Sequence, residues 1–219
     1  YLKKVTAASL RSTTSEHKLK EDDEIIVTAE TTNKSELLFF SDMCNVYKIK
    51  TYDMPECKVT ALGEYLPGIL GLEENEKIVY TVVTKDFEGL MLFTFENGKM
   101  AKVALKNYET KTNRKKLIGA YSAKSPIRDI KFLKEDTDIA VVTDNGRILC
   151  LNTELIPLKS TKSTQGVQVI KQPKNGARPV SVKEADSCGI DGISAYRIRS
   201  IPAAAKSPKH ENIQLSLLP

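Results

Sequence analysis

Short stretches of alternating apolar and polar residues recur along the chain. Four of them follow the pattern apolar, any residue, usually lysine, apolar, and they lie at residues 2–5, 46–49, 100–103 and 148–151. The starts of successive stretches are 44, 54 and 48 residues apart. Apolar side chains at alternate positions are typical of a strand with one buried face, so each stretch is predicted to be a β-strand.

A second apolar run precedes three of these predicted strands, at residues 37–40, 90–93 and 139–142. In two cases the connection contains Asn-Gly, at Asn97-Gly98 and Asn145-Gly146. Asn and Gly tolerate the positive φ of a tight turn, which makes this dipeptide a strong β-hairpin signal. The first connection, residues 41–45, lacks glycine and is predicted to be a longer loop.

Each unit then continues with a polar stretch, a glycine and another apolar run. Gly63, Gly119 and Gly166 follow the starts of their strands by 17, 19 and 18 residues. Apolar runs such as residues 77–83 and 127–132 come next, so each unit holds about four strands in roughly 50 residues. This period predicts an all-β, propeller-like ring of about four blades with four strands each.

The ends of the ring are less regular. Helical periodicity is nearly absent, and residues 16–24 are too polar and acidic to pack as a helix. Residues 196–201 alternate like one more strand, which could pair with the first unit and remove an exposed edge. We therefore expect a ring domain over residues 1–202 and a flexible C-terminal tail over residues 203–219.

Composition supports a folded domain and excludes several classes. The 219 residues are 41% hydrophobic, which is enough for a core, and no apolar run reaches the 18 residues of a spanning helix. The chain opens without methionine or an apolar leader, which suggests a fragment of a longer, non-secreted protein. The net charge of +5 is uneven, because residues 98–134 carry +9 and residues 21–97 carry −10. The basic stretch indicates either an anionic partner or a solvated surface.

Cysteines and histidines give little support for a metal site or an enzyme. The four cysteines have no C-x-x-C spacing, and both histidines lie in polar segments far from any cysteine. We expect reduced thiols in a cytosolic protein, with Cys150 packed in a strand. No Ser-His-Asp set, carboxylate pair or phosphate loop stands out, so an enzymatic role for this chain is disfavoured.

The sequence resembles a family on several of these motifs. The resemblance is to the C-terminal domain of bacterial type IIA topoisomerase A subunits, those of DNA gyrase and topoisomerase IV. It is carried by residues 31–40 (TTNKSELLFF), 46–55 (VYKIKTYDMP), 61–72 (ALGEYLPGILGL) and 76–78 (EKI). Residues 1–4 (YLKK) are similar to the family's first-blade strand, and residues 164–170 (TQGVQVI) to its Gly-Val-x-x-Ile element. Together they cover roughly residues 1–172.

The resemblance implies a β-pinwheel, a ring of blades that exchange strands, with double-stranded DNA bent around a basic rim. Such a domain is non-catalytic and needs no cofactor. Its parent would be an ATP-dependent type II DNA topoisomerase in the bacterial cytoplasm, associated with the nucleoid. The partners implied are DNA and the rest of the A subunit, which in turn brings the ATPase B subunit; the isolated domain is expected to be monomeric and not membrane-bound.

One motif of the family is missing. Gyrase A subunits carry a glycine- and arginine-rich box in the first blade, and the equivalent residues 9–21 contain neither a Gly-Gly pair nor a double Arg. Because the family uses this box to wrap DNA chirally, its absence favours a topoisomerase IV-like subunit or a gyrase-like one with weak wrapping.

Candidate DNA contacts are the lysines and arginines of the basic stretches, since cations on one face bind phosphates without reading sequence. The first group comprises Lys3, Lys4, Arg11, Lys18 and Lys20; the second comprises Lys99, Lys102, Lys106, Lys111, Arg114, Lys115, Lys116 and Lys124; Lys48 and Lys50 lie on the strand equivalent to those of Lys4 and Lys102. Lys159 and Lys162 are further candidates. The acidic runs 21–24 and 73–76 are expected at blade corners facing away from DNA, or alternatively to keep the domain off DNA.

The alternative is a protein-interaction propeller. It shares the blade period and the hairpins but would carry an exposed apolar or aromatic patch in place of a basic rim. The repeat signatures Trp-Asp and Gly-His are absent from the sequence, which disfavours this alternative.

Overall fold

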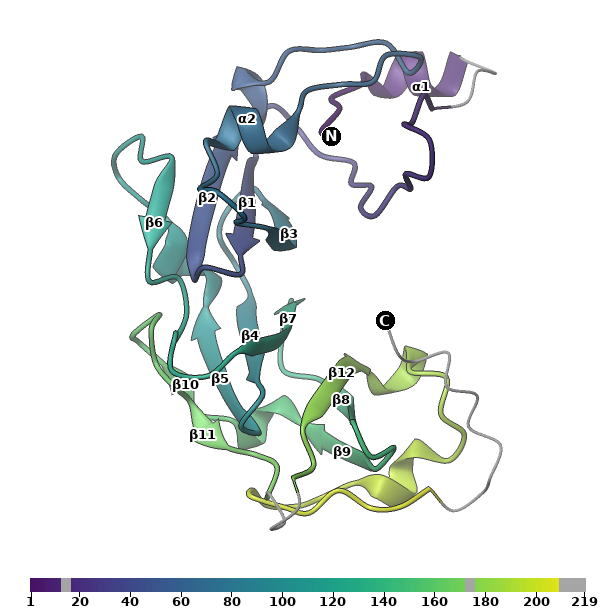
Figure 1. Cartoon of the computed structure of the whole chain (residues 1–219), viewed down its shortest axis with the longest axis vertical. Coiled ribbons are helices and arrows are strands. Elements are labelled where there is room, and N and C mark those ends of the chain that lie inside the picture. Colours follow the sequence, from purple (N-terminus) through teal and green to yellow (C-terminus); the bar gives the residue numbers. More distant parts are fainter. Residues whose placement is uncertain (13–16, 172–175, 209–219) are drawn as a thin grey trace. The chain divides into compact units, whose positions relative to one another are not determined.

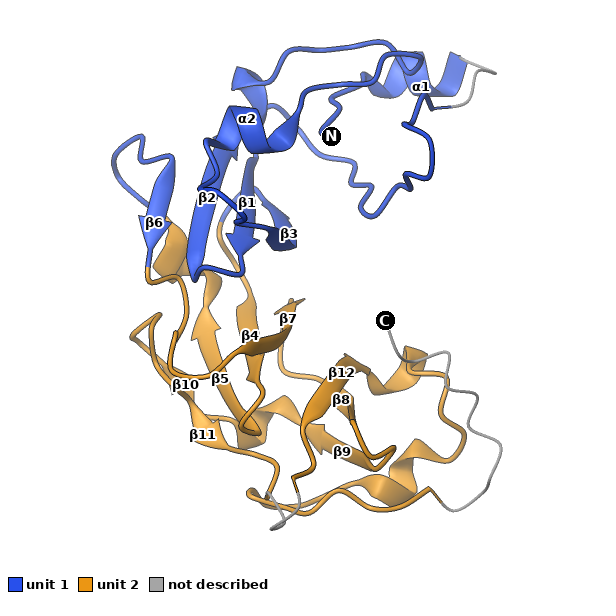
Figure 2. Ribbon diagram, viewed as in Figure 1, with its two compact units in different colours: residues 1–86, 110–118 blue, residues 87–109, 119–219 orange. Residues whose placement is uncertain are grey.

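The computed structural model describes residues 1–12, 17–171 and 176–208 (Figure 1). It divides into two compact units (Figure 2). Unit 1 comprises Tyr1–Asp86 and Thr110–Ile118, and unit 2 comprises Phe87–Glu109 and Gly119–Pro219. No helix among the described residues is long and apolar enough to cross a membrane.

Unit 1 contains one sheet of four strands in the order β3-β1-β2-β6. These are β1 (Glu36–Ser41), β2 (Asn45–Lys50), β3 (Ile78–Thr84) and β6 (Lys116–Ile118). The unit also holds helices α1 (Ala7–Ser12) and α2 (Leu66–Leu70) and the 3-10 turn η1 (Thr51–Asp53). Its core gathers around Phe39 and Tyr47.

Unit 2 contains two sheets within its described residues. One has the order β10-β5-β4-β7, with β11 also paired to β5, and the other has the order β12-β8-β9. The strands are β4 (Leu90–Phe95), β5 (Lys99–Ala104), β7 (Ile127–Leu133), β8 (Asp138–Thr143), β9 (Ile148–Asn152), β10 (Leu158–Lys159), β11 (Val167–Gln168) and β12 (Pro179–Glu184). The described residues of this unit also form four 3-10 turns: η2 (Leu105–Tyr108), η3 (Thr153–Leu155), and, after the last strand, η4 (Ala185–Ser187) and η5 (Ile193–Tyr196). The predominantly β structure that the alternation predicted is confirmed.

The three predicted hairpins are present as β1–β2, β4–β5 and β8–β9. The first loop is not longer than the others, contrary to the prediction, because Phe40 pairs with Val46 as Thr94 pairs with Met100. Cys44 adopts a φ of 59°, close to the 75° of Gly98 in the equivalent turn. A cysteine therefore occupies a left-handed position that the Asn-Gly signal cannot reveal.

Strands are exchanged between distant segments of the chain in a repeated manner. Each strand that carries the apolar–lysine pattern receives a partner from a segment beyond the next hairpin or turn. The pairs are Leu2 with Glu64, Val46 with Leu117, Met100 with Val167 and Ile148 with Lys206. Gly63 and Gly166 directly precede the exchanged residues Glu64 and Val167, whereas Gly119 directly follows the exchanged strand β6.

The last predicted strand, residues 196–201, has a different partner from the one expected. Tyr196 ends the 3-10 turn η5, and Arg197 bridges in parallel to Cys150 of β9 within unit 2. This is the position that β10 takes beside β5, where Leu158 pairs in parallel with Lys102. The pairing continues past residue 202, at Ala203 and Lys206, and residues 209–219 of the predicted tail lie outside the described residues.

Gly166 is a position where the exchanged strand depends on the absence of a side chain. A Cβ at Gly166 would overlap the Met100 carbonyl, whereas a Cβ at Gly119 would meet nothing within 4 Å. Both residues have positive φ, 69° and 63°. We expect Gly119→Ala to cost about 1–2 kcal/mol from the left-handed backbone alone. Gly166→Ala should cost a further 1–3 kcal/mol or so from the overlap. Urea denaturation of the two variants measures the difference, and equal costs would contradict this account.

Candidate nucleic-acid interface

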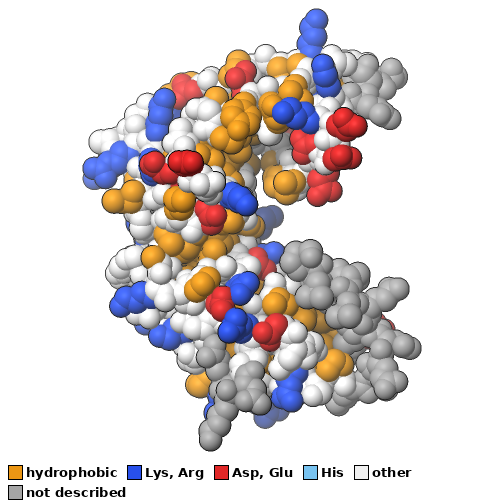
Figure 3. Space-filling model, viewed as in Figure 1, with side chains coloured by type: hydrophobic (Ala, Val, Ile, Leu, Met, Phe, Trp, Pro, Cys, Tyr) orange, Lys and Arg blue, Asp and Glu red, His pale blue; other side chains and the backbone are white. Residues whose placement is uncertain are grey.

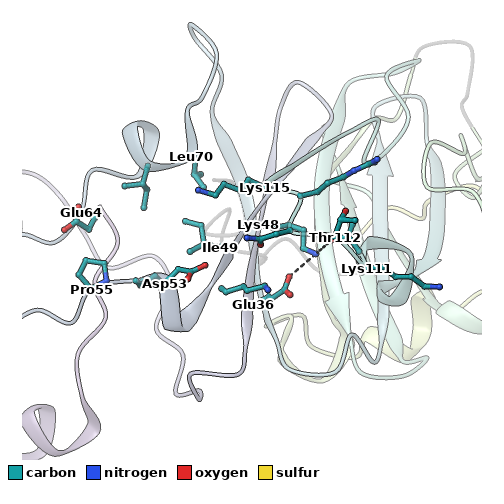
Figure 4. A pocket seen from close by; sticks show the side chains of 16 residues that line it. Glu36, Lys48, Ile49, Asp53, Pro55, Glu64, Leu70, Lys111, Thr112 and Lys115 are labelled. Atoms are coloured by element: carbon teal, nitrogen blue, oxygen red, sulfur yellow. Dashed lines mark hydrogen bonds and ion pairs between the residues drawn. The ribbon is translucent and has the colours of Figure 1, made fainter.

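A concave site in unit 1 brings five of the predicted basic residues together. The cavity measures about 370 Å³ and lies between β2, the residues after it, helix α2 and the loop 110–115 (Figure 4). Its basic lining residues are Lys48, Lys50, Lys111, Arg114 and Lys115. Three carboxylates also line it, those of Glu36, Asp53 and Glu64. The site is therefore a mixed polar cavity with an excess of positive charge.

The side chain of Lys48 is buried, and its ammonium is paired within the fold. Its ammonium donates to Thr110 Oγ1 at 3.1 Å and pairs with the Glu36 carboxylate at 2.9 Å, and only 5% of its side chain is exposed (Figure 4). Lys102 has the same arrangement on β5, where its ammonium pairs with Asp136 at 2.5 Å and donates to the Thr153 carbonyl at 2.9 Å.

Lys4 occupies the equivalent position on the first repeat. Its ammonium donates to the carbonyls of Thr51 and Met54 at 3.1 and 3.4 Å. In the fourth repeat the position is Cys150, which is buried against Tyr196. The shared lysine thus ties its strand to a neighbouring turn or carboxylate. We leave Lys4, Lys48 and Lys102 out of the DNA-contacting set proposed below.

The loop 110–115 carries the exposed charge of the site. Lys111, Arg114 and Lys115 are all exposed, and among the described residues none of the three forms an ion pair. Figure 4 shows the Lys111 side chain extending away from Lys48. Lys50 is half-buried, with its ammonium 5.6 Å from the centre of the Tyr52 ring.

Lys116 lies at the edge of this site and is engaged locally. Its ammonium is 5.1 Å from the centre of the Tyr47 ring and 2.9 Å from the Glu73 carboxylate. The hydroxyl of Tyr47 and the carboxylate of Glu73 raise the pKa of Lys116. Lys116 is therefore charged but already paired.

The N-terminal cations of unit 1 lie apart from the cavity lining. Lys3 donates to the carbonyls of Lys18 and Val59, at 2.7 and 3.2 Å. Arg11 is exposed and 3.8 Å from Glu30. Lys18 and Lys20 are exposed, and the Lys20 ammonium lies 5.1 Å from the centre of the Tyr1 ring.

The remaining predicted cations are in unit 2. Lys99 is half-buried and donates to Gln165 at 3.3 Å, whereas Lys106 and Lys124 are exposed. Lys106 pairs with Glu109 at 2.8 Å. Lys159 and Lys162 are half-buried, and the Lys162 ammonium lies 5.6 Å from the centre of the Tyr108 ring. Acidic and basic side chains alternate over the face of unit 1 drawn in Figure 3, so charge on that face is mixed.

One carboxylate of the acidic run 73–76, that of Glu76, is buried within the fold. Glu76 is only 6% exposed and accepts hydrogen bonds from Ser41 Oγ, Asn45 Nδ2 and Tyr47 Oη. The backbone N–H of Glu73 adds a fourth at 3.0 Å. Burial alone would raise the pKa of Glu76, but these hydrogen bonds outweigh it and lower the pKa to about 2. The signal in the sequence is the polar Ser41, Asn45 and Tyr47 around an otherwise apolar hairpin.

Comparisons with known proteins agree with this architecture. No family model matches the chain. The chain is 27% identical over 135 residues to the A subunit of DNA gyrase from Clostridium acetobutylicum, covering 61% of this chain and 16% of the relative. It is 28% identical over 192 residues to the same protein from Klebsiella oxytoca, covering 81% and 21%. The chain therefore spans only about a fifth or less of the length of these relatives.

Solved structures show the same fold. A crystal structure of the C-terminal domain of DNA topoisomerase IV superposes with a TM-score of 0.74 and 24% identity, over 86% of this chain and 59% of that one. The C-terminal domain of E. coli ParC superposes with a TM-score of 0.64 and 11% identity, over 90% of this chain and 85% of that one. The strand exchange and hairpins described above are thus those of a known fold, the predicted β-pinwheel. The chain is thus similar in fold to the C-terminal domains of type IIA topoisomerase A subunits, and distantly similar in sequence to the A subunits of DNA gyrase.

Proposed function

We propose that this chain is a non-catalytic domain that binds and bends double-stranded DNA without reading its sequence. The observation that carries the proposal is the loop 110–115, whose three exposed cations have no ion-pair partner among the described residues and lie beside Lys50 at a concave site. The fold, which is that of the C-terminal domains of topoisomerase A subunits, supports it.

The chemistry of these side chains suits phosphate oxygens. Lysine and arginine carry full charge at neutral pH, and arginine presents a planar fork that matches a phosphate. Neutralising phosphates releases condensed counterions, so such contacts supply affinity that falls with salt and is nearly independent of sequence. Cations at the surface of the fold are the ones available for this exchange.

The proposed contacting residues are those whose charge is not held inside the fold. They are Arg11, Lys18, Lys20, Lys50, Lys106, Lys111, Arg114, Lys115 and Lys124. Bending a duplex over them costs a few kcal/mol or so, which the phosphate contacts must offset. In the whole protein, an ATP-dependent type II topoisomerase acting in the bacterial cytoplasm, the domain would present a DNA segment to the cleavage gate. The missing gyrase box favours a parent that is topoisomerase IV-like, or gyrase-like with weak DNA wrapping.

Salt titration of DNA binding tests this proposal. If roughly five phosphates are neutralised, log K should fall against log salt concentration with a slope near −4 to −5. The measurement is an electrophoretic mobility shift with duplexes longer than about 100 base pairs, which leave room for bending. Two unrelated duplex sequences should give the same slope. Binding that does not depend on salt, or no binding at low salt, would rule the proposal out.

A further inference from the structure

Lys48 contacts both ends of the loop 110–115, which carries the exposed cations of the site. At the end of the loop that joins β6, the backbone N–H of Lys48 donates to the carbonyl of Lys115 at 2.8 Å. This bond continues the ladder in which Tyr47 of β2 pairs with Lys116 of β6. At the start of the loop, the ammonium of Lys48 donates to Thr110 Oγ1 at 3.1 Å. One residue therefore fixes the loop twice, through its main chain and through its side chain.

Hydrogen bonds inside the loop extend this contact towards Arg114. The hydroxyl of Thr110 accepts from Lys48 and donates to the carbonyl of Thr112 at 2.9 Å. The same carbonyl accepts from the backbone N–H of Arg114 at 2.7 Å. A continuous series of hydrogen bonds thus leads from the buried ammonium to the residue that carries the guanidinium.

The ammonium of Lys48 is itself fixed from inside the fold. It pairs with the carboxylate of Glu36 on β1 at 2.9 Å, and the two side chains are 5% and 21% exposed. Figure 4 shows this ion pair beside Thr112. A buried charge that lost its partner would be strongly unfavourable, so the position of the ammonium is closely determined.

The equivalent lysine of the next repeat has no such loop to hold. Lys102 is also buried and paired, with Asp136, but its ammonium donates to the main-chain carbonyl of Thr153. Thr153 begins the turn η3, whose three residues include no lysine or arginine. The same kind of ion pair therefore occurs once next to a cationic loop and once next to a turn without cations.

We propose, on the basis of the proposed function, that Lys48 is a positioning residue for DNA binding. With Glu36 it holds the loop 110–115 in the conformation in which the three exposed cations of the loop contact phosphates. A loop that is ordered before binding loses less conformational entropy when the complex forms. Lys48 adds affinity in this way without touching a phosphate itself.

The test replaces the ion pair in the full chain by apolar residues, Lys48→Met with Glu36→Leu, which leaves the net charge unchanged. Without DNA, hydrogen exchange at the amides of residues 110–115 should become about 10-fold faster, because the loop opens more easily. Affinity for duplex DNA in a mobility-shift titration should fall by about 10-fold, which is the cost of ordering about one further residue. The slope of log K against log salt should stay that of the original chain, since the same phosphates are neutralised.

A second variant, Thr110→Val, keeps the ion pair and removes only the hydroxyl that links it to the loop. It should change exchange and affinity in the same direction, again with the original salt slope. The matched control is Lys102→Met with Asp136→Leu, which removes the equivalent ion pair from unit 2. This control should leave exchange at 110–115 and DNA affinity as they are in the original chain. Exchange at β1, β2, β4 and β5 shows whether the sheets are folded in each variant.

A double-mutant cycle separates positioning from a general loss of structure. The change Lys48→Met with Glu36→Leu is repeated in a chain that already carries Lys111→Ala, Arg114→Ala and Lys115→Ala. If Lys48 acts through the loop, it should cost no further affinity there.

The possible failures are distinguishable. An equal loss of affinity with and without the three loop cations, an equal loss in the control, or unchanged exchange at 110–115 in both the ion-pair variant and Thr110→Val would overturn the role of Lys48 and leave the proposed function standing. If removal of the three loop cations alone leaves DNA binding unchanged, DNA does not bind at this loop, and the proposed function fails there together with the role of Lys48.

Discussion

Glu76→Leu is expected to destabilise the sheet of unit 1 by about 3–5 kcal/mol. The carboxylate is buried and accepts from three side chains and one backbone N–H. A leucine side chain accepts no hydrogen bonds, so buried donors on both strands of the first hairpin would lose their acceptor. Urea denaturation measures the free energy of unfolding, and hydrogen exchange at β1 and β2 reports on this sheet.

Glu74→Leu is the matched control. Glu74 lies two residues away in the same acidic run and is exposed, so the same substitution there should change stability by less than about 0.5 kcal/mol. Glu76→Gln keeps the size of the side chain but places an NH₂ donor among the donors that Glu76 accepts from. Its loss of stability should lie between those of Glu74→Leu and Glu76→Leu. If the variants at 74 and 76 are equally stable, the buried carboxylate does not hold the hairpin as described.

The pH dependence of this effect has a defined sign. Because the pKa of Glu76 is lowered from 4.5 to about 2 in the folded state, the carboxylate contributes its stability above pH 4.5. That contribution is lost as the pH falls from 4.5 towards 2. The stability difference between the original chain and Glu76→Gln should therefore shrink over this interval.

The sequence predicts the local elements of this fold well and their partners poorly. Alternation and Asn-Gly turns locate the hairpins, because pleat and turn chemistry are local properties. The exchanged pairs join residues such as Met100 and Val167, which no local pattern connects. For the same reason, the alternation over residues 196–201 allows a pairing with the first unit, whereas Arg197 bridges to Cys150 of β9.

In the candidate site too, local features are predictable from the sequence and tertiary partners are not. The run of cations over 111–116 is visible in the sequence, and the structure places Lys111, Arg114 and Lys115 on an exposed loop. Lys48 and Lys102 occupy the same position of the repeat, and the sequence alone suggests two further cations for DNA. In the structure both are buried and paired with carboxylates. Which lysine is paired depends on Glu36 and Asp136, whose positions follow from tertiary packing and not from spacing along the chain.

Removing the three exposed cations of the loop should weaken DNA binding strongly. In the variant Lys111→Ala, Arg114→Ala and Lys115→Ala, each lost phosphate contact should reduce the salt slope by about 0.9, from near −4 to −5 to about −2. At about 0.1 M salt this corresponds to a loss of affinity on the order of 100-fold or more. The loss should be the same for duplexes of unrelated sequence, since phosphates carry no sequence information.

Lys102→Met separates contact with DNA from net charge. It removes one cation that is buried and paired with Asp136, so it should lower the free energy of unfolding by about 1–3 kcal/mol and leave the salt slope within error of the original chain. The triple loop variant should show the reverse, an unchanged free energy of unfolding and a changed slope, because its three side chains have no ion-pair partner among the described residues. Equal slopes for the triple variant and the original chain would mean that DNA binds elsewhere on the domain.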